Sequence, residues 1–234
     1  MNYAIIAAGE GSRLVQEGVP EPKPFVRING ERMIDRLIRI FLNNKAQSIT
    51  IIVNEQMTQV SSYLQGVTLP VALQVIVCST PSSMHSFYEL SKVMPSGKFC
   101  LTTVDTIFKE SDFARYIDYF ENDSLHDGVF AVTDFIEDES PLYVDVDSAD
   151  HFTIRQFRDD CYDGCRFISG GIYGLTDRVF PILKDAVVSN QSRMRNFQRR
   201  LLAEKLMIQA FPFEKIIDVD HLSDIAVAES FLSM

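Results

Sequence analysis

Short apolar runs alternate with amphipathic stretches along the first 135 residues of the chain. The runs are rich in isoleucine and valine, which is typical of strands in a sheet covered on both faces. Between the runs, residues 33–42 place their large apolar side chains on one stripe of a helix. The alternation predicts strands over residues 3–8, 49–54, 71–77, 99–104 and 129–133, and helices over residues 33–42, 56–64, 83–94 and 112–121.

The pattern changes after about residue 135. Residues 142–146 and 151–157, separated by a polar turn, predict a β-hairpin, and residues 167–175 predict another strand. Two helical stretches follow, then a strand over residues 207–213 and a helix over residues 222–232. We therefore predict an α/β fold with one domain over residues 1–234. Its mostly parallel, doubly wound, Rossmann-like sheet occupies about residues 1–135, and a C-terminal lobe that includes the hairpin occupies about residues 136–234.

Composition and charge exclude several classes of protein. Hydrophobic residues make up 46% and charged residues 23% of the 234 residues, as in globular domains. The 22 basic and 32 acidic residues give a net charge of −10, so we expect no nucleic-acid partner. We also expect no membrane partner, because the N-terminus lacks the basic region of a signal peptide and no apolar run approaches roughly 18 residues. The scattered cysteines Cys78, Cys100, Cys161 and Cys165 favour free thiols in a cytoplasmic protein.

A glycine-containing loop directly after the first predicted strand carries the clearest chemistry. Gly9 and Gly11 let backbone N–H groups approach a phosphate, and Arg13 adds a permanent cation. Lys23 lies between two prolines, which stiffen the backbone around a second cation that we expect to be exposed. Leu14 replaces the third glycine of a dinucleotide-binding fingerprint, and no Walker motif follows. The pattern favours a site for several phosphates; the alternative is a tight turn with an exposed arginine and lysine.

These residues, AAGEGSRL from Ala7 and PKPFV from Pro22, resemble the start of the nucleotidyltransferase superfamily that makes nucleotide sugars and related diphosphates. Its members include sugar-1-phosphate, phosphocholine and molybdopterin nucleotidyltransferases. The likeness continues in family order at LTTVD (residues 101–105), ISGGIY (168–173) and IDVDHLSD (217–224). The resemblance implies a nucleotide-diphospho-sugar transferase-like fold and attack by an acceptor phosphate on the α-phosphorus of an NTP.

The resemblance also implies a role for each matching residue. Arg13 and Lys23 are the implied catalytic cations, and Asp105 with Asp220 are the implied ligands of a Mg²⁺ cofactor. Asp218 competes with Asp220, since the two share a face of a strand. The alternative role for Asp105 and Asp220 is helix capping. The implied nucleotide-binding residues are Ala7, Ala8, Gly9, Gly11, Ser12, Arg13, Ser82 and Ser86, and the implied acceptor-binding residues are Arg158, Ser169, Gly170 and Gly171.

Two departures from the family pattern keep alternatives open. Val104 stands where a glycine often precedes the aspartate, and Arg158 stands where sugar-binding members often have a glutamate. The expected function is Mg²⁺-dependent NMP transfer from an NTP to a small phosphorylated acceptor, most simply a sugar 1-phosphate, in a chain that can form a homodimer. The alternatives are phosphocholine or another non-sugar acceptor, and a catalytically silent nucleotide-binding regulator. Residues 137–139, which are acidic, predict an exposed loop.

Overall fold

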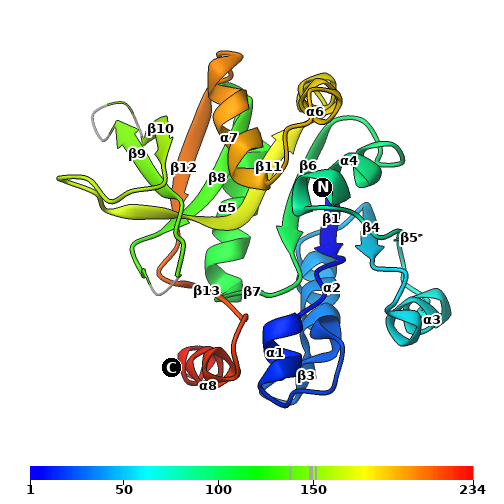
Figure 1. Cartoon of the computed structure of the whole chain (residues 1–234). Coiled ribbons are helices and arrows are strands. Elements are labelled where there is room, and N and C mark those ends of the chain that lie inside the picture. Colours follow the sequence, from blue (N-terminus) through cyan, green and yellow to red (C-terminus); the bar gives the residue numbers. More distant parts are fainter. Residues whose placement is uncertain (137–138, 148–149, 151, 234) are drawn as a thin grey trace.

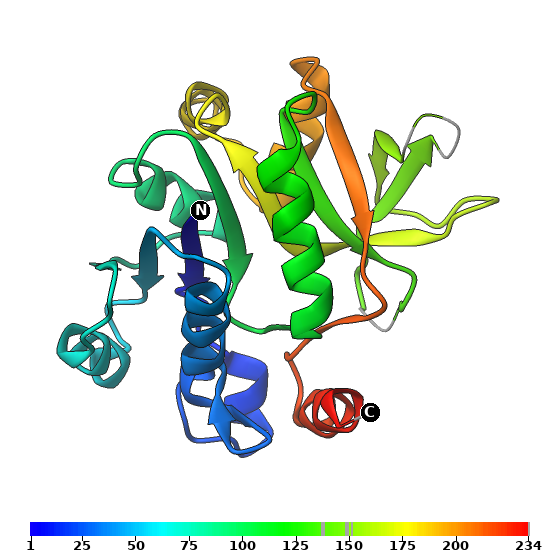
Figure 2. The same ribbon diagram turned by 180° about the vertical axis from the view of Figure 1, so that it is seen from behind.

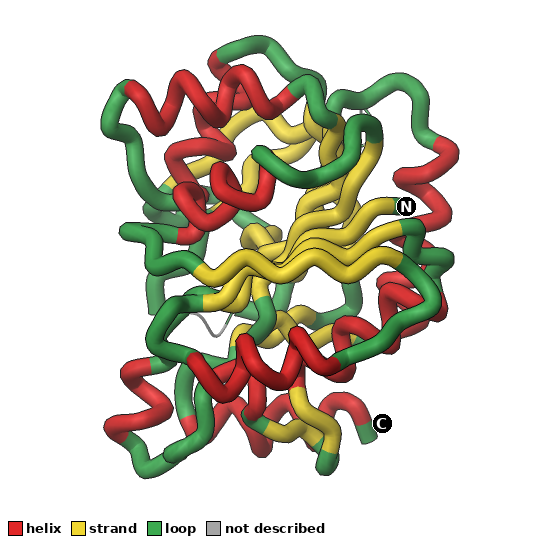
Figure 3. The backbone as a smooth tube through the Cα atoms, turned by 90° about the vertical axis from the view of Figure 1, so that its right-hand side faces the viewer, coloured by secondary structure: helices red, strands yellow, loops and turns green. Residues whose placement is uncertain are grey.

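The computed structural model of the chain describes residues 1–136, 139–147, 150 and 152–233. A nine-stranded sheet crosses the molecule, and helices cover both of its faces (Figures 1 and 2). A side view places the twisted strands between two helical layers (Figure 3). The α/β class and the single domain that the sequence predicts are confirmed.

The first half of the sheet is parallel. Strand β1 (Asn2–Ala7) pairs in parallel with β4 (Ser48–Val53) and with β6 (Lys98–Thr103), and β4 pairs in parallel with β5 (Ala72–Val77). All six residues of β1 are buried, as expected of a central strand with both faces covered. The carboxyl ends of β1 and β6 therefore lie side by side, which is where open α/β sheets place their ligands.

The second half of the sheet is mixed. Strand β11 (Phe167–Thr176) runs antiparallel between β6 and β8 (Gly128–Thr133), and β12 (Ile208–Pro212) is parallel to β8. The predicted hairpin is formed by β9 (Tyr143–Asp147) and β10 (Thr153–Arg158); position 151 of its predicted second strand lies outside the described residues. The parallel pairing predicted for the first 135 residues is thus confirmed for β1, β4, β5 and β6, and the antiparallel pairings of this sheet involve strands from the C-terminal part of the chain.

Two hydrophobic cores lie on opposite faces of the sheet. Helices α2 (Met33–Asn43), α3 (Thr58–Gly66), α5 (Glu110–Asn122) and α8 (Leu222–Leu232) contribute to one core. Helices α4 (Ser83–Ser91), α6 (Val179–Val188) and α7 (Met194–Ala203) contribute to the other core. Among the described residues, none of these helices has the length and apolar character needed to cross a membrane.

Several short elements that the sequence pattern did not predict position the C-terminal segment. Strand β13 (Ile216–Asp218) pairs with β7 (Thr106–Phe108), which follows β6 directly. After β13, the N–H of Val219 donates to the carbonyl oxygen of Asp105 at 3.1 Å. Helix α8 then lies near α1 (Ser12–Gln16), so the C-terminal segment lies beside the segment that follows β1 (Figure 1). The remaining short elements are η1 (Lys23–Phe25), β2 (Arg27–Ile28) and β3 (Glu31–Arg32).

Candidate functional site

Lys23 is at the centre of the site. It begins the 3₁₀ turn η1 between Pro22 and Pro24, and its side chain is only 7% exposed. Its ammonium group donates to Oδ2 of Asp105 and, at 2.6 Å, to Oδ1 of Asp220. The expectation of an exposed lysine is wrong, because its two partners lie 82 and 197 residues further along the chain and their approach leaves no local pattern.

Lys23 and Asp105 both stay charged at neutral pH. Burial lowers the pKa of Lys23, but the charges of Asp105 and Asp220 outweigh it and raise the pKa above its ordinary value. Burial raises the pKa of Asp105, and the charge and hydrogen bond of Lys23 reverse this, so the pKa is lowered. A buried charge is tolerated only where such compensation exists.

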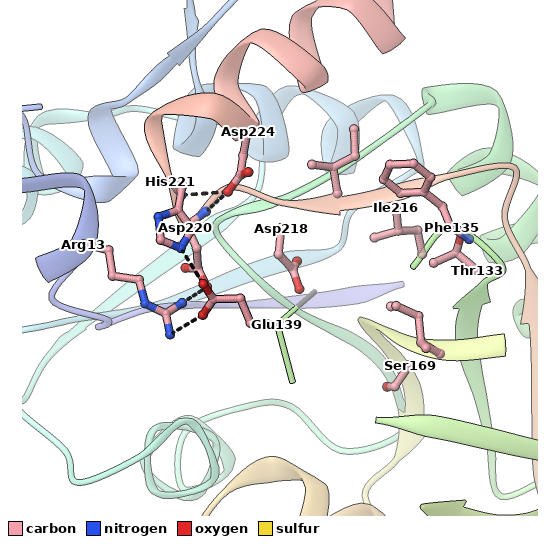
Figure 4. Close-up of a pocket in the computed structure, with 13 residues that line it drawn as sticks. Arg13, Thr133, Phe135, Glu139, Ser169, Ile216, Asp218, Asp220, His221 and Asp224 are labelled. Carbon is pink, nitrogen blue, oxygen red and sulfur yellow. Dashed lines mark hydrogen bonds and ion pairs between the residues drawn. The ribbon is translucent and has the colours of Figure 1, made fainter. Parts of the chain in front are cut away.

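Arg13 completes the cationic side of the site. Its Nη1 lies 3.1 Å from Oδ2 of Asp220, and its Nη2 lies 3.4 Å from Oε2 of Glu139 (Figure 4). Oε1 of Glu139 in turn lies 3.5 Å from Nε2 of His221. The Arg13 side chain is 52% exposed and can reorient toward a ligand. The contacts of Glu139 could not be predicted from its place in an acidic loop. Glu137 and Asp138 of that loop lie outside the described residues.

The glycine loop lies against Lys23. Residues Ala7 to Gly11 lead from the end of β1 into α1, whose first residues are Ser12 and Arg13. Gly11 has φ 63°, and a Cβ built on it would lie 3.0 Å from Cβ of Lys23. A Cβ on Gly9 would meet no atom of the described residues within 4 Å. Gly11 is therefore the position where the loop specifically requires glycine.

A pocket of about 90 Å³ adjoins the ion-paired residues (Figure 4). Ser169 and Gly170 of β11 line it, as does Asp218 of β13, which accepts a hydrogen bond from Thr106 Oγ1 at 3.2 Å. A Cβ on Gly171 would contact this same Thr106 hydroxyl at 3.2 Å, next to the pocket. The remaining lining residues are Arg13, Thr133, Phe135, Glu139, Ile168, Ile216, Ile217, Asp220, His221 and Asp224.

Three of the residues that the resemblance singled out lie apart from this pocket. The hydroxyl of Ser86 is buried against Thr80 at 2.6 Å, and the hydroxyl of Ser82 contacts Nδ1 of His85 at 2.9 Å. Arg158 pairs with Asp145 at 3.4 Å and borders a separate hollow beside Tyr162. Arg158 is thus not among the described residues that line the pocket, and the binding roles of all three residues stay predictions.

The two carboxylates that share Lys23 fit a divalent cation. Oδ1 of Asp105 is buried and has no hydrogen-bond partner among the described residues, so this oxygen is available to a cation. Within the described part of the chain, no group of three or more His, Cys, Asp or Glu side chains could hold a metal ion. Mg²⁺ ordinarily takes one or two carboxylates and completes its shell with water and substrate phosphates. Asp220 contacts the same ammonium as Asp105, and the choice between Asp220 and Asp218 as the second ligand stays a prediction.

Comparison with solved structures shows the same fold in three other proteins. The inositol-1-phosphate CTP transferase of T. maritima superposes with a TM-score of 0.82 at 17% identity, over 99% of this chain and 96% of that one. A Bacillus anthracis protein assigned as a glucose-1-phosphate thymidylyltransferase, solved with sucrose, gives a TM-score of 0.85 at 14% identity, over 99% and 95%. HddC from Yersinia pseudotuberculosis gives a TM-score of 0.74 at 19% identity, over 98% of each chain.

A search of curated protein sequences found no match to this chain. Comparison of the sequence with models of protein families did find one. The MobA-like NTP transferase domain matches residues 3–164, which include the glycine loop, Lys23 and Asp105. The chain therefore belongs to the MobA-like NTP transferase family and is a nucleotidyltransferase.

Proposed function

We propose that this nucleotidyltransferase transfers NMP from an NTP to a sugar 1-phosphate and releases pyrophosphate, with Mg²⁺ bound. The observation that carries the proposal is the convergence of Lys23, Arg13, Asp105 and Asp220 between the glycine loop and the pocket. Two cations, two carboxylates and a backbone loop are the parts needed to bring two phosphate groups together, because both reactants are anions.

Each side chain has a role in this reaction. Arg13 holds the β- and γ-phosphates, where a planar guanidinium can bind two oxygens of the leaving pyrophosphate. Lys23 neutralises charge on the α-phosphate as the acceptor oxygen attacks in line. Asp105 and Asp220 would hold Mg²⁺, which when bound supplies charge neutralisation at the phosphates. Gly9 and Gly11 keep the loop backbone accessible to the triphosphate.

The pocket supports a small polar acceptor. Ser169 and Asp218 offer hydrogen-bonding groups, while Phe135 and Ile216 give apolar surface. A pocket with a few polar groups on apolar walls is typical of small-molecule sites. The names of the compared proteins, which refer to inositol 1-phosphate and glucose 1-phosphate, support a sugar or polyol phosphate as the acceptor.

The proposal also covers the partners, the oligomeric state and the cellular compartment of the protein. We infer that the partners are an NTP and the phosphorylated acceptor, that two copies can form a homodimer, and that neither nucleic acid nor a membrane is a partner. The cytoplasm is the proposed compartment, since the four cysteines are free and the activity requires a nucleotide pool.

A pyrophosphate-release assay tests the proposal. Purified enzyme is mixed with each of ATP, CTP, GTP, UTP and dTTP, with Mg²⁺, and with a panel of sugar 1-phosphates, inositol 1-phosphate and phosphocholine. We expect one pair to release pyrophosphate in a manner that chelation abolishes and Asp105→Asn weakens. Turnover with phosphocholine alone would overturn the sugar acceptor, and tight NTP binding without turnover on any pair would contradict the transfer reaction.

A further inference from the structure

We infer that Lys23 occupies the divalent-cation position in the ligand-free enzyme and leaves both carboxylates when the cation binds. Lys23 would then contact the two carboxylates in the ligand-free enzyme and a phosphate oxygen once the cation and the nucleotide are bound. The inference rests on the proposed function only in assigning Asp105 and Asp220 to the cation.

The contacts of the ammonium group are those that a metal would make. It bridges one oxygen of Asp105 and one oxygen of Asp220, and the latter contact is 2.6 Å long. Asp105 approaches from the end of β6 and Asp220 from the segment after β13, so nothing else in the described chain joins the two carboxylates directly. Without a cation between them, two carboxylates this close would repel each other.

The ammonium and a divalent cation compete for the same oxygens. Mg²⁺ binds its oxygen ligands at about 2.0–2.1 Å and tolerates little distortion. A second cation beside a buried ammonium would meet strong repulsion at low dielectric. Because Lys23 is 7% exposed, the ammonium cannot escape this repulsion by hydration where it lies.

The surroundings of Lys23 determine where the displaced group can go. Pro22 and Pro24 hold the backbone of η1, so only the side-chain torsions are free to change. The aliphatic part of the side chain lies next to Gly11, with Cβ, Cγ and Cδ 3.0–3.7 Å from the position of a Cβ on that glycine. A Lys23 side chain that leaves the carboxylates therefore stays beside the loop assigned to the phosphates.

A metal titration without nucleotide tests the exchange. Mn²⁺ binding to the wild-type protein and to Lys23→Met is followed by electron paramagnetic resonance of the free ion. We expect Lys23→Met to bind Mn²⁺ about tenfold more tightly or better, since the metal no longer displaces charge-assisted hydrogen bonds. Equal or weaker binding would overturn the inference. In a protein that already carries Asp105→Asn, adding Lys23→Met should no longer increase the affinity for Mn²⁺. An increase in affinity in that background would overturn the inference, because the metal would then not be binding where Lys23 contacts Asp105.

A second measurement uses the wild-type protein, so it decides the matter even if Lys23→Met fails to fold. Acetylation of lysines by an N-hydroxysuccinimide ester is followed by mass spectrometry with and without Mn²⁺. We expect Lys23 to react several-fold faster with Mn²⁺, while the exposed Lys184 serves as an internal control and does not change. An unchanged rate for Lys23 would contradict displacement, even if the affinity of Lys23→Met rises. Neither experiment contains an NTP, so an enzyme without transfer activity could still show the exchange.

Discussion

Lys23 and Gly11 show how single residues link the sequence to the site. The flanking prolines and the two glycines predicted a stiffly held cation near a phosphate-binding loop. The structure places Lys23 beside the glycine loop, and phosphate binding by that loop stays a prediction. Burial of Lys23 could not be predicted, because it depends on carboxylates that the fold brings from 82 and 197 residues away. The need for glycine at position 11 likewise arises from the side chain of Lys23, which packs beside it.

Replacement of Lys23 by alanine should impair both catalysis and folding. We expect kcat to fall about 100-fold or more, as when one preorganised donor to a transition state is removed. The free energy of unfolding should fall by about 2 kcal/mol. This value lies between the contribution of an exposed ion pair and the cost of removing one partner of a buried ion pair. Kinetics at saturating substrate and urea denaturation measure the two effects. An activity loss no larger than the unfolded fraction would mean that Lys23 is only structural.

Gly11 and Gly9 form a matched pair for testing the loop. The free energy of unfolding of Gly11→Ala should be about 1–3 kcal/mol lower than that of the wild type, because alanine is strained at this positive φ and its Cβ would crowd Lys23. The stability of Gly9→Ala should stay within about 0.5 kcal/mol of the wild type, since its Cβ meets no atom of the described residues within 4 Å. Thermal or urea unfolding of both variants checks this. Equal losses in the two variants would contradict the close packing of Gly11 against Lys23.

At the scale of elements, the long apolar and amphipathic segments could be predicted and the short ones could not. The pattern predicted β1, β4, β6 and α2 because burial on one stripe or on both faces marks them. It missed the β7–β13 pair, whose strands have three residues each and join positions more than 100 residues apart. This pair directs Asp218 and Asp220 toward the site, so the missed elements are those that assemble it.

The start of α8 is tied to the end of α1 by a pH-dependent contact. Nδ1 of His221 and the backbone N–H of Leu222 each lie 2.6 Å from a carboxylate oxygen of Glu17. Hydrogen bonding to Glu17 raises the pKa of His221 above 6.5, and hydrogen bonding to His221 lowers the pKa of Glu17 below 4.5. The His221 contribution to stability is therefore complete below pH 6.5 and is lost as pH rises through the raised pKa. The Glu17 contribution is complete above pH 4.5 and is lost as pH falls through the lowered pKa.

Glu17→Gln should remove this dependence. The difference in melting temperature between wild type and Glu17→Gln should be larger at pH 5.5 than at pH 8.5, though small at both because the side chains are at the surface. Differential scanning fluorimetry at the two pH values measures it, with Glu55→Gln at an exposed position as the control. A difference that is constant with pH, or larger at pH 8.5, would contradict the assigned contact.

At the scale of the whole molecule, segments from three distant parts of the chain must come together for the site to exist. The glycine loop and Lys23 come from the N-terminal region, Asp105 from the middle and Asp220 from the C-terminal segment. The order of these motifs along the chain predicted the family, which the match over residues 3–164 confirms. The acceptor was beyond prediction, because the pocket is lined by side chains from segments spread over the sequence and its shape depends on their packing.

The most direct test of the account is a crystal structure with a non-hydrolysable NTP analogue and Mg²⁺. We predict the triphosphate along the glycine loop with Arg13 on its β- and γ-phosphates, the metal on Asp105 and Asp220, and the Lys23 ammonium on a phosphate oxygen. A triphosphate bound elsewhere, or Lys23 still bridging the two carboxylates beside a bound metal, would contradict the account.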